Sequence, residues 1–454
     1  MKHFLEFNRN IINELSDWAI RKNRKPLILR GARQVGKTTA VTMFSKQFDQ
    51  YLYVNLEKKE DRDIFLSDMP FGKMVDALFF LKNISRNSGR ILIFIDEIQN
   101  APQAVSYLRY FLEDEPDLYV IASGSLFETI LDRKINIPVG RVDYLMMRPV
   151  SFSEYLSAIG QNVLLDALER IPCEEYTHLK LLEEFCRFVL IGGMPEIIKQ
   201  YSNSRDLTEL SPIYETLLTS YTEDMEKYAR NLTQARIMSQ IFESILSSAG
   251  NRIKFQGFGQ TPYKSREIQQ AFSLLEKAML ISLVYPHTKS SIPIQPNRRK
   301  SPRLHFLDVG LINYHMGIQK DLILTSQLDS VYQGKIAEMI VGQEILSTSF
   351  LPSRKINFGT KDKKQSSAEI DYLLQFDQKL IPIEVKSGKT GMMRALQQYM
   401  ENSEHPFAVR FYSGNIRIDS PVLPSGKKYT LLNLPYYLSI KINEYLSWFM
   451  NSTD

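Results

Sequence analysis

Cysteine and histidine are scarce in this chain. Of its 454 residues only two are cysteines, Cys173 and Cys186, and six are histidines. The cysteines form no Cys-x-x-Cys pair and the histidines no His-Glu-x-x-His pattern, so neither a disulfide framework, a zinc ribbon nor a metalloprotease helix is available. A chain with so few thiols is typical of a reducing compartment, and we expect a cytoplasmic protein.

Long apolar runs are missing as well. The longest uncharged apolar stretch is residues 278–286, far shorter than the roughly 20 residues that a membrane helix needs. Charges interrupt the first fifteen residues, which therefore predict no secretory signal. With 44% hydrophobic and 24% charged residues, the composition is that of a soluble globular protein of two to four domains without a membrane partner.

Charge is distributed unevenly along the chain. Residues 251–454 contain 26 Lys/Arg against 17 Asp/Glu, whereas residues 1–250 contain 30 against 34. A basic C-terminal half is typical of proteins that bind a polyanion such as DNA or RNA. Solvated surface lysines without a partner explain the same numbers, and the two explanations stay open here.

A glycine-rich motif follows the first buried strand, residues 26–30. The segment GARQVGKTT, residues 31–39, matches G-x-x-x-x-G-K-[ST]. The glycines let backbone N–H groups face a polyphosphate, and the next helix presents its N-terminus to the same anion. Lys37 is expected to reach the β- and γ-phosphates and Thr38 to ligate Mg²⁺. We therefore predict ATP and Mg²⁺ as cofactors, with the nucleotide bound by Gly31, Gly36, Lys37, Thr38 and Thr39.

Two acids end the strand ILIFIDE, residues 91–97. Its five apolar residues indicate a strand buried on both faces, as in a parallel sheet. Ligands bind where such strands end, so Asp96 is expected to hold Mg²⁺ and Glu97 to polarise the attacking water. The alternative for Glu97 is an exposed carboxylate without a role.

Three further polar residues belong to the predicted site. Ser123 and Ser125 end another buried strand, residues 118–125, where a hydroxyl can sense the γ-phosphate. Arg141 opens the next strand and is a candidate for stabilising transition-state charge, from the same subunit or a neighbouring one. An ordinary structural arginine is the alternative.

The segments GARQVGKTT, FIDEIQNAP, ASGS, GRVDYLMMRPVSFSEYL and IGGMPE occur in that order. Together they resemble the prokaryotic P-loop ATPases of the AAA+ and archaeal-ATPase type, whose ATPase core is fused to a C-terminal domain of unassigned function. The resemblance covers essentially the whole chain. It implies an α/β fold with a P-loop parallel sheet at 1–157, a helical segment at 158–230, a winged-helix-like domain at 231–310 and a restriction-endonuclease-like α/β domain at 311–454. Because ring-forming members often carry an arginine finger, a homo-oligomer is also implied.

Residues 233–310 read as two helices followed by a basic, proline-broken hairpin. In a DNA-binding winged helix the second helix enters the major groove. Basic side chains of the hairpin then grip phosphates; the candidates are Arg298, Arg299, Lys300 and Arg303. A module for packing or subunit contact is the alternative.

Residues 369–388 read as a β-hairpin. With its turn between residues 377 and 378, Asp371 lies opposite Glu384 at about 4.5–5.5 Å between Cβ atoms, a spacing that suits one shared cation. Lys386 lies on the same face as Glu384. Together with Glu338 from a preceding helix, this resembles the restriction-endonuclease-like fold.

In that fold the carboxylates hold Mg²⁺ and the lysine helps to activate water. One departure from the pattern is Ile370, where many members have proline. Two functions remain open. One is an ATPase whose C-terminal half cleaves or binds nucleic acid; the other is a nucleotide-switched protein whose C-terminal half is a non-catalytic protein-binding module.

Overall fold

The computed structural model describes residues 7–86, 89–124, 140–229, 231–319, 334–360, 369–386 and 393–452. The chain forms two compact units: one comprises Met1–Pro149 with Ser273–Leu280 and Phe350–Ser353, and the other the remainder. The first unit thus ends its main segment near the predicted boundary at 157, and the finer division of the second stays a prediction. Among the described helices, none is long and apolar enough to cross a membrane.

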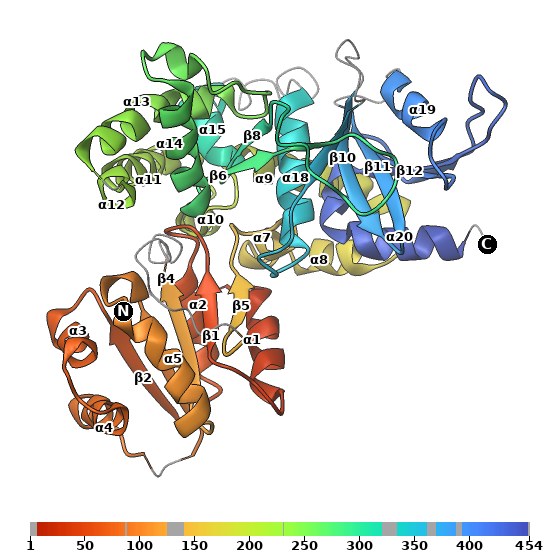
Figure 1. Cartoon of the computed structure of the whole chain (residues 1–454). Coiled ribbons are helices and arrows are strands. Elements are labelled where there is room, and N and C mark those ends of the chain that lie inside the picture. Colours follow the sequence, from red (N-terminus) through yellow and green to blue (C-terminus); the bar gives the residue numbers. More distant parts are fainter. Residues whose placement is uncertain are drawn as a thin grey trace. The chain divides into compact units, whose positions relative to one another are not determined.

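The first unit is built on a five-stranded sheet in the order β2-β3-β4-β1-β5. All its strand pairs are parallel, as the buried apolar runs predict. Its elements are shown in Figure 1: α1 (Ile11–Ile20), β1 (Leu27–Arg30), α2 (Lys37–Ser45), β2 (Gln50–Asn55), α3 (Lys59–Leu66), α4 (Phe71–Leu81), β3 (Ile91–Asp96), α5 (Gln103–Asp114), β4 (Tyr119–Gly124) and β5 (Asp143–Met146).

Helices cover the sheet and bring its carboxyl edge to the phosphate loop. Apolar residues of α3, α4 and α5 pack with those of β2, β3 and β4 in one buried cluster, while α2 contacts α1 and β3. The strand β3 is buried at all six positions. Because the loop between β1 and α2 leaves the sheet beside the ends of β3 and β4, the predicted phosphate-binding and acidic residues lie together.

The second unit begins with helices, as the sequence predicts, and continues with two longer helices and a short antiparallel strand pair, β6 and β8. These elements are α7 (Phe152–Ala158), α8 (Asn162–Glu169), α9 (His178–Ile191), α10 (Pro195–Ser204), α11 (Ser211–Glu223), α12 (Met225–Tyr228), α13 (Leu232–Ser248), α14 (Ser265–Lys277), β6 (Ile281–Val284), β8 (Arg303–Phe306) and α15 (Val309–His315). The predicted hairpin is therefore present, but its first strand begins earlier than the basic segment.

A mixed sheet follows, in the order β13-β14-β12-β11-β10-β9-β7. The helix α18 precedes β9, and α19 connects β11 to its parallel neighbour β12 (Figure 1). The elements are β7 (Pro286–His287), α18 (Gly334–Ser347), β9 (Asn357–Thr360), β10 (Glu369–Phe376), β11 (Lys379–Val385), α19 (Arg394–Met400), β12 (Phe407–Tyr412), β13 (Arg417–Asp419), β14 (Thr430–Pro435) and α20 (Ile442–Asn451).

The register of the β10–β11 hairpin is the predicted one. Tyr372 pairs with Ile383, and the ladder continues to the pair Phe376 and Lys379. Both turn residues, 377 and 378, have positive φ, of 42° and 58°, as a tight two-residue turn between twisted strands requires. Asp371 and Glu384 are the next residues beyond the first pair.

The Gly-Gly motif at 192–193 is a structural joint between α9 and α15. Gly192 has φ 76° and ψ −173°, a conformation essentially restricted to glycine. The carboxylate of Asp308 accepts hydrogen bonds from the backbone N–H of Gly193 at 2.6 Å and of Gly310 at 2.9 Å. A Cβ on Gly192 would lie 2.1 Å from Asp308 Oδ1. The motif therefore needs no chemical role to explain its residues.

The motif at 149–155 is structural too. Ser151 and Glu154 form a capping box at the N-terminus of α7, which satisfies backbone donors that the helix leaves unpaired. The carboxylate of Glu344, from α18, accepts a further bond from the N–H of Phe152 at 3.1 Å. Burial is the main reason why the pKa of Glu344 is raised to about 8, and the nearby Glu154 adds to it.

Candidate nucleotide site and a second carboxylate cluster

The loop between β1 and α2 has the shape that the phosphate-binding motif predicts. Gly36, the last residue before α2, has φ 94°, which a side chain would strain. A Cβ on Gly31 would lie 2.6 Å from the carbonyl oxygen of Met147. The N-terminus of α2, with Thr38 and Thr39 exposed in its first turn, is therefore able to receive an anion.

Lys37 lies beneath this loop. Its Nζ donates to the carbonyl oxygens of Gly31 at 3.0 Å and Ala32 at 2.8 Å. Burial lowers its pKa to about 8, although the charges of Glu97 and Asp96 oppose the shift. The carbonyls hold the ammonium in the loop, where an anionic ligand would stabilise its charged form.

Asp96 is the polar centre of the site. It is only 3% exposed, and its Oδ2 accepts a hydrogen bond from Thr38 Oγ1 at 2.7 Å and another from the Tyr53 hydroxyl at 3.3 Å. Its Oδ1 accepts from Ser123 Oγ. The two predicted Mg²⁺ ligands, Thr38 and Asp96, thus touch, and oxygen donors of this kind suit Mg²⁺.

Glu97 follows Asp96 in a left-handed conformation, φ 53° and ψ 45°. Its side chain accepts a hydrogen bond from Gln99 Nε2, and burial raises its pKa. Gln99 in turn needs Gly124 beside it, because a Cβ there would lie 2.5 Å from Gln99 Oε1. The structure therefore holds the predicted water-polarising carboxylate in a fixed orientation.

Other predicted residues have different surroundings. Ser123 is fully buried and bonded to Asp96, so it contacts the metal-binding candidate instead of facing the phosphate position. Arg141 is half exposed and pairs with Glu113 on α5 at 3.3 Å. Ser125 lies outside the described residues.

Sequence reasoning missed two residues of this site, Tyr53 and Gln99. Tyr53 lies on β2 and its hydroxyl contacts Asp96. The only sequence signal is the alternation in residues 51–55, which places Tyr53 two positions before the strand's end. Gln99 is within the quoted segment FIDEIQNAP, but nothing in its residue type indicates a bond to Glu97.

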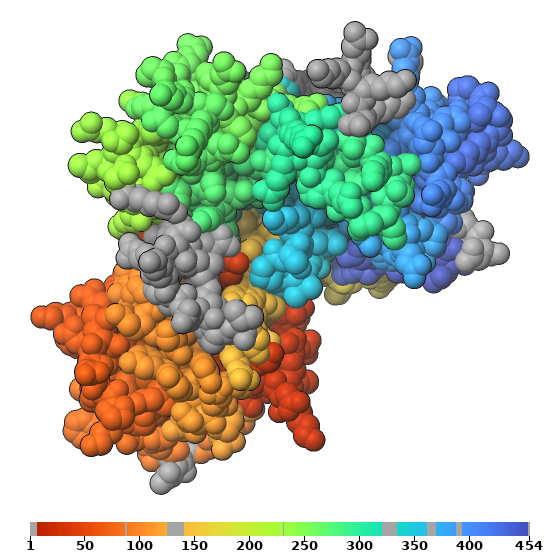
Figure 2. Space-filling view, viewed as in Figure 1, coloured from red at the N-terminus to blue at the C-terminus, as the bar shows by residue number. Residues whose placement is uncertain are grey.

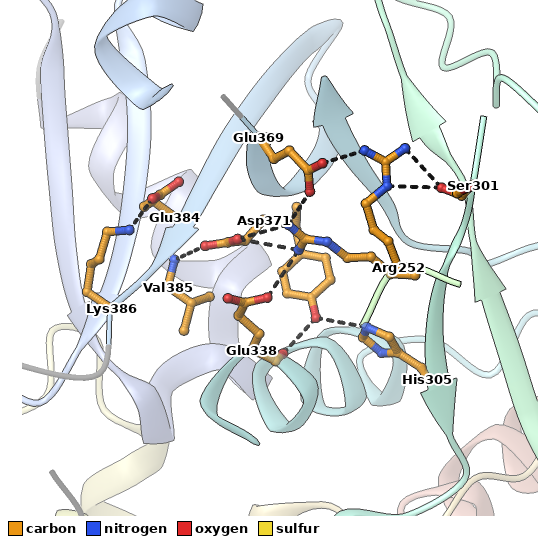
Figure 3. Close-up of polar contacts among 11 residues, drawn as sticks. Arg252, Ser301, His305, Glu338, Glu369, Asp371, Glu384, Val385 and Lys386 are labelled. Carbon is orange, nitrogen blue, oxygen red and sulfur yellow. Dashed lines mark hydrogen bonds and ion pairs between the residues drawn. The ribbon is translucent and has the colours of Figure 1, made fainter. Parts of the chain in front are cut away.

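A second cluster of carboxylates lies in the other unit, around Arg303 of β8 (Figure 3). The guanidinium donates to Glu338 Oε2 at 3.1 Å and to Glu369 Oε2 at 2.9 Å. It also contacts Asp371 Oδ1, at 3.4 and 3.5 Å. Arg303 is 7% exposed, so the prediction that it grips phosphates from the surface is wrong.

Asp371 and Glu384 are held on opposite sides of this cluster. Asp371 Oδ2 accepts from the N–H of Val385 at 2.8 Å, and Lys386 forms an ion pair with Glu384 Oε1 (Figure 3). Burial raises the pKa of Glu384 to about 7, and the Asp371 charge adds to the rise. The other oxygen of Glu384, Oε2, is buried without a hydrogen-bond partner.

Glu338 is positioned through its own backbone. The Tyr372 hydroxyl donates to the Glu338 carbonyl oxygen at 2.6 Å, which ties α18 to β10. Burial raises the pKa of Glu338 to about 8, and Asp371 adds to this more than Glu384 does. Carboxylates that repel and are desolvated in this way need a cation nearby.

The fit of these groups to a metal ion is incomplete in this arrangement. Across the part of the chain that the structure describes, no three His, Cys, Asp or Glu residues are grouped so as to hold one. Arg303 and Lys386 already occupy oxygens of the three predicted ligands, Glu338, Asp371 and Glu384. The metal role of these residues stays a prediction.

Comparisons with known proteins place the first unit in a class. Residues 23–156 match the family model of an AAA domain. Residues 182–322 and 333–428 match two domains of unknown function, DUF8612 and DUF4143. No curated protein matches the chain. The first unit is an AAA-type ATPase-like domain, and the family matches assign no activity to the second.

Solved structures with a similar arrangement include ATPases from archaea and bacteria. The Walker-type ATPase PABY2304 of Pyrococcus abyssi is 12% identical with a TM-score of 0.45, covering 68% of this chain and 96% of its own. The Orc1 protein of Aeropyrum pernix in complex with DNA is 13% identical with a TM-score of 0.26, covering 70% and 95%. The RuvB branch migration motor of Thermotoga maritima is 14% identical with a TM-score of 0.27, covering 61% and 90%.

Proposed function

We propose that this chain is an Mg²⁺-dependent ATPase that couples nucleotide hydrolysis to a C-terminal half that contacts nucleic acid. The observation that carries the first part is the bond of 2.7 Å between Thr38 and Asp96, with Lys37 held beneath the same loop. A hydroxyl, a carboxylate and an ammonium meet where a helix N-terminus already favours an anion.

Each residue has a defined task in this proposal. Lys37 binds the β- and γ-phosphates, and Thr38 and Asp96 hold Mg²⁺. The metal, when bound, neutralises charge on the phosphates. Glu97 orients the attacking water and accepts its proton, and its bond with Gln99 fixes the carboxylate's direction. Burial raises the Glu97 pKa, which makes it a better proton acceptor.

Two substitutions test the ATPase. Lys37→Ala is expected to abolish tight nucleotide binding, whereas Glu97→Gln is expected to retain ATP binding and lose hydrolysis by about 10²-fold or more. Calorimetry with a non-hydrolysable ATP analogue measures the first, and phosphate release the second. Wild-type turnover in Glu97→Gln would remove this carboxylate from the mechanism, and unchanged nucleotide affinity in Lys37→Ala would refute the site.

Support for the C-terminal half comes from its topology and charge. A helix, three antiparallel strands, a second helix and a parallel strand follow one another in α18, β9, β10, β11, α19 and β12, the order of a restriction-endonuclease-like core. Arg298 and Arg299 are exposed between β7 and β8, in a segment that lies at the surface of the face seen in Figure 2. Exposed arginines of this kind bind phosphates.

Nucleic acid contact is tested by salt. Affinity for duplex DNA and for RNA of equal length, measured by anisotropy, is expected to fall steeply between 50 and 200 mM salt. The double variant Arg298→Ala/Arg299→Ala is expected to reduce the slope by about two, one for each lost phosphate contact. Absence of binding at the lowest salt would instead favour the second candidate, a nucleotide-switched protein-binding module. That candidate is favoured by one observation, the neutralisation of Asp371 by Arg303.

A further inference from the structure

The carboxylate cluster of the second unit contains four acids: Glu338, Glu369, Asp371 and Glu384. Burying several carboxylates together is costly unless cations compensate them. In the restriction-endonuclease-like layout that the sequence resembles, the compensating cation is a metal ion. Here a side chain from a different part of the chain makes these contacts.

Arg303 reaches the cluster from β8, outside the helix and strands that carry the acids. Its two terminal nitrogens contact Glu338, Glu369 and Asp371 at 2.9 to 3.5 Å. The guanidinium also lies over the ring of Phe358, 4.7 Å from its centroid, which suits a cation. Charge, planarity and packing therefore hold Arg303 in one place (Figure 3).

We propose that Arg303 is the resident cation of this cluster: its guanidinium takes the carboxylate oxygens that a divalent ion would need, and the two exclude each other. The structure that has Arg303 inserted is the metal-free form of the domain. Removing the guanidinium frees Glu338 Oε2 and Asp371 Oδ1, next to Glu384 with its unpartnered Oε2.

This inference goes beyond the proposed function, and it relies on the nuclease-like resemblance only for the choice of a divalent ion as competitor. ATP binding by the first unit does not enter it. The two proposals therefore fail separately: ATP affinity reports on the nucleotide site, and Mn²⁺ stoichiometry on the carboxylate cluster.

The experiment counts bound Mn²⁺ by electron paramagnetic resonance in the full, nucleotide-free chain. The wild type is expected to show no site that depends on Asp371. Arg303→Gln and Arg303→Met are each expected to gain one Mn²⁺ per chain, and adding Asp371→Asn is expected to remove it. Arg303→Lys keeps a cation and should gain none.

Arg252 provides the matched control. It is also an arginine paired with Glu369, at 2.5 Å, and lies over the same Phe358 ring at 5.3 Å, but it makes no recorded contact with Asp371. Arg252→Gln should therefore gain no Mn²⁺. Two results would overturn the proposal: an Asp371-dependent Mn²⁺ site in the wild type, or no gain in either Arg303 variant whose circular dichroism shows a folded chain. If neither variant folds, the wild-type comparison with Asp371→Asn still decides whether metal and guanidinium coexist.

Discussion

Buried acids in this protein differ in how they are compensated. Asp96 accepts three hydroxyl hydrogen bonds, Asp308 accepts backbone N–H groups, and Asp371 faces a guanidinium. Glu344 has the weakest compensation of this group, because its partner of known distance is one backbone N–H and its neighbour Glu154 is another acid. A carboxyl in such surroundings is expected to stay protonated near neutral pH.

Glu344 therefore gives a pH-dependent contribution to stability. Its pKa in the folded chain, about 8, lies above the ordinary 4.5, so the folded state binds the proton more tightly. The stabilisation is complete below the ordinary value and is lost as pH rises through about 8. Relative to the wild type, Glu344→Gln should thus become more stable as pH rises across this window, by at most about 1.4 kcal/mol per pH unit.

Thermal unfolding from pH 5 to 8.5 measures this difference. Glu223→Gln serves as the control, because Glu223 is an exposed residue at the end of α11 and its removal deletes a charge without changing a buried group. Its midpoint should follow the wild type at every pH. Parallel profiles for wild type and Glu344→Gln would show that Glu344 is ionised in the folded chain.

At the scale of elements, the junction of α9 and α15 depends on the absence of a side chain at Gly192. An added Cβ would meet Asp308 Oδ1 at 2.1 Å and the Gly310 nitrogen at 2.7 Å, and the left-handed backbone adds its own strain. Gly192→Ala should lower stability by about 3 kcal/mol or more, because the carboxylate that caps α15 must move.

Gly160 makes a sharp comparison. It too has positive φ, 72°, but nothing lies within 4 Å of an added Cβ. Gly160→Ala should therefore cost only the backbone term, about 1–2 kcal/mol. Urea unfolding of both variants measures the gap, and equal losses would show that the contact with Asp308 is not what requires glycine at 192.

Sequence patterns predict these elements where local chemistry decides them. The buried strands of the first sheet follow from their apolar runs, and the register at Asp371 follows from a two-residue turn whose residues both have positive φ. The contact between Arg303 and Asp371 could not be predicted, because 68 residues separate them and nothing local marks one basic residue of the hairpin as buried. The same holds for Gly192 and Asp308, which look like an ordinary turn and an ordinary acid.

At the scale of the whole molecule, the question is whether the nucleotide site is complete within one chain. Arg141 pairs with Glu113 in this structure, yet its side chain remains 49% exposed. An exposed ion pair of this kind contributes little to stability, so Arg141 is able to leave it for a phosphate. If Arg141 acts across a subunit boundary, Arg141→Ala should lose turnover while its ATP affinity stays close to the wild type.

Mixing two inactive variants tests sharing. A site built from Glu97 of an Arg141→Ala chain and Arg141 of a Glu97→Gln chain is intact, so random assembly at equal ratio should restore about a quarter of the sites in a symmetric ring. Arg109→Ala is the matched control: Arg109 pairs with the same Glu113, at 2.9 Å, and is 54% exposed, so its loss should leave turnover unchanged. Restored turnover in the mixture, measured by phosphate release, requires an oligomer that shares sites. A mixture without activity, or a monomer with full turnover, would mean that any contribution of Arg141 is made within its own chain.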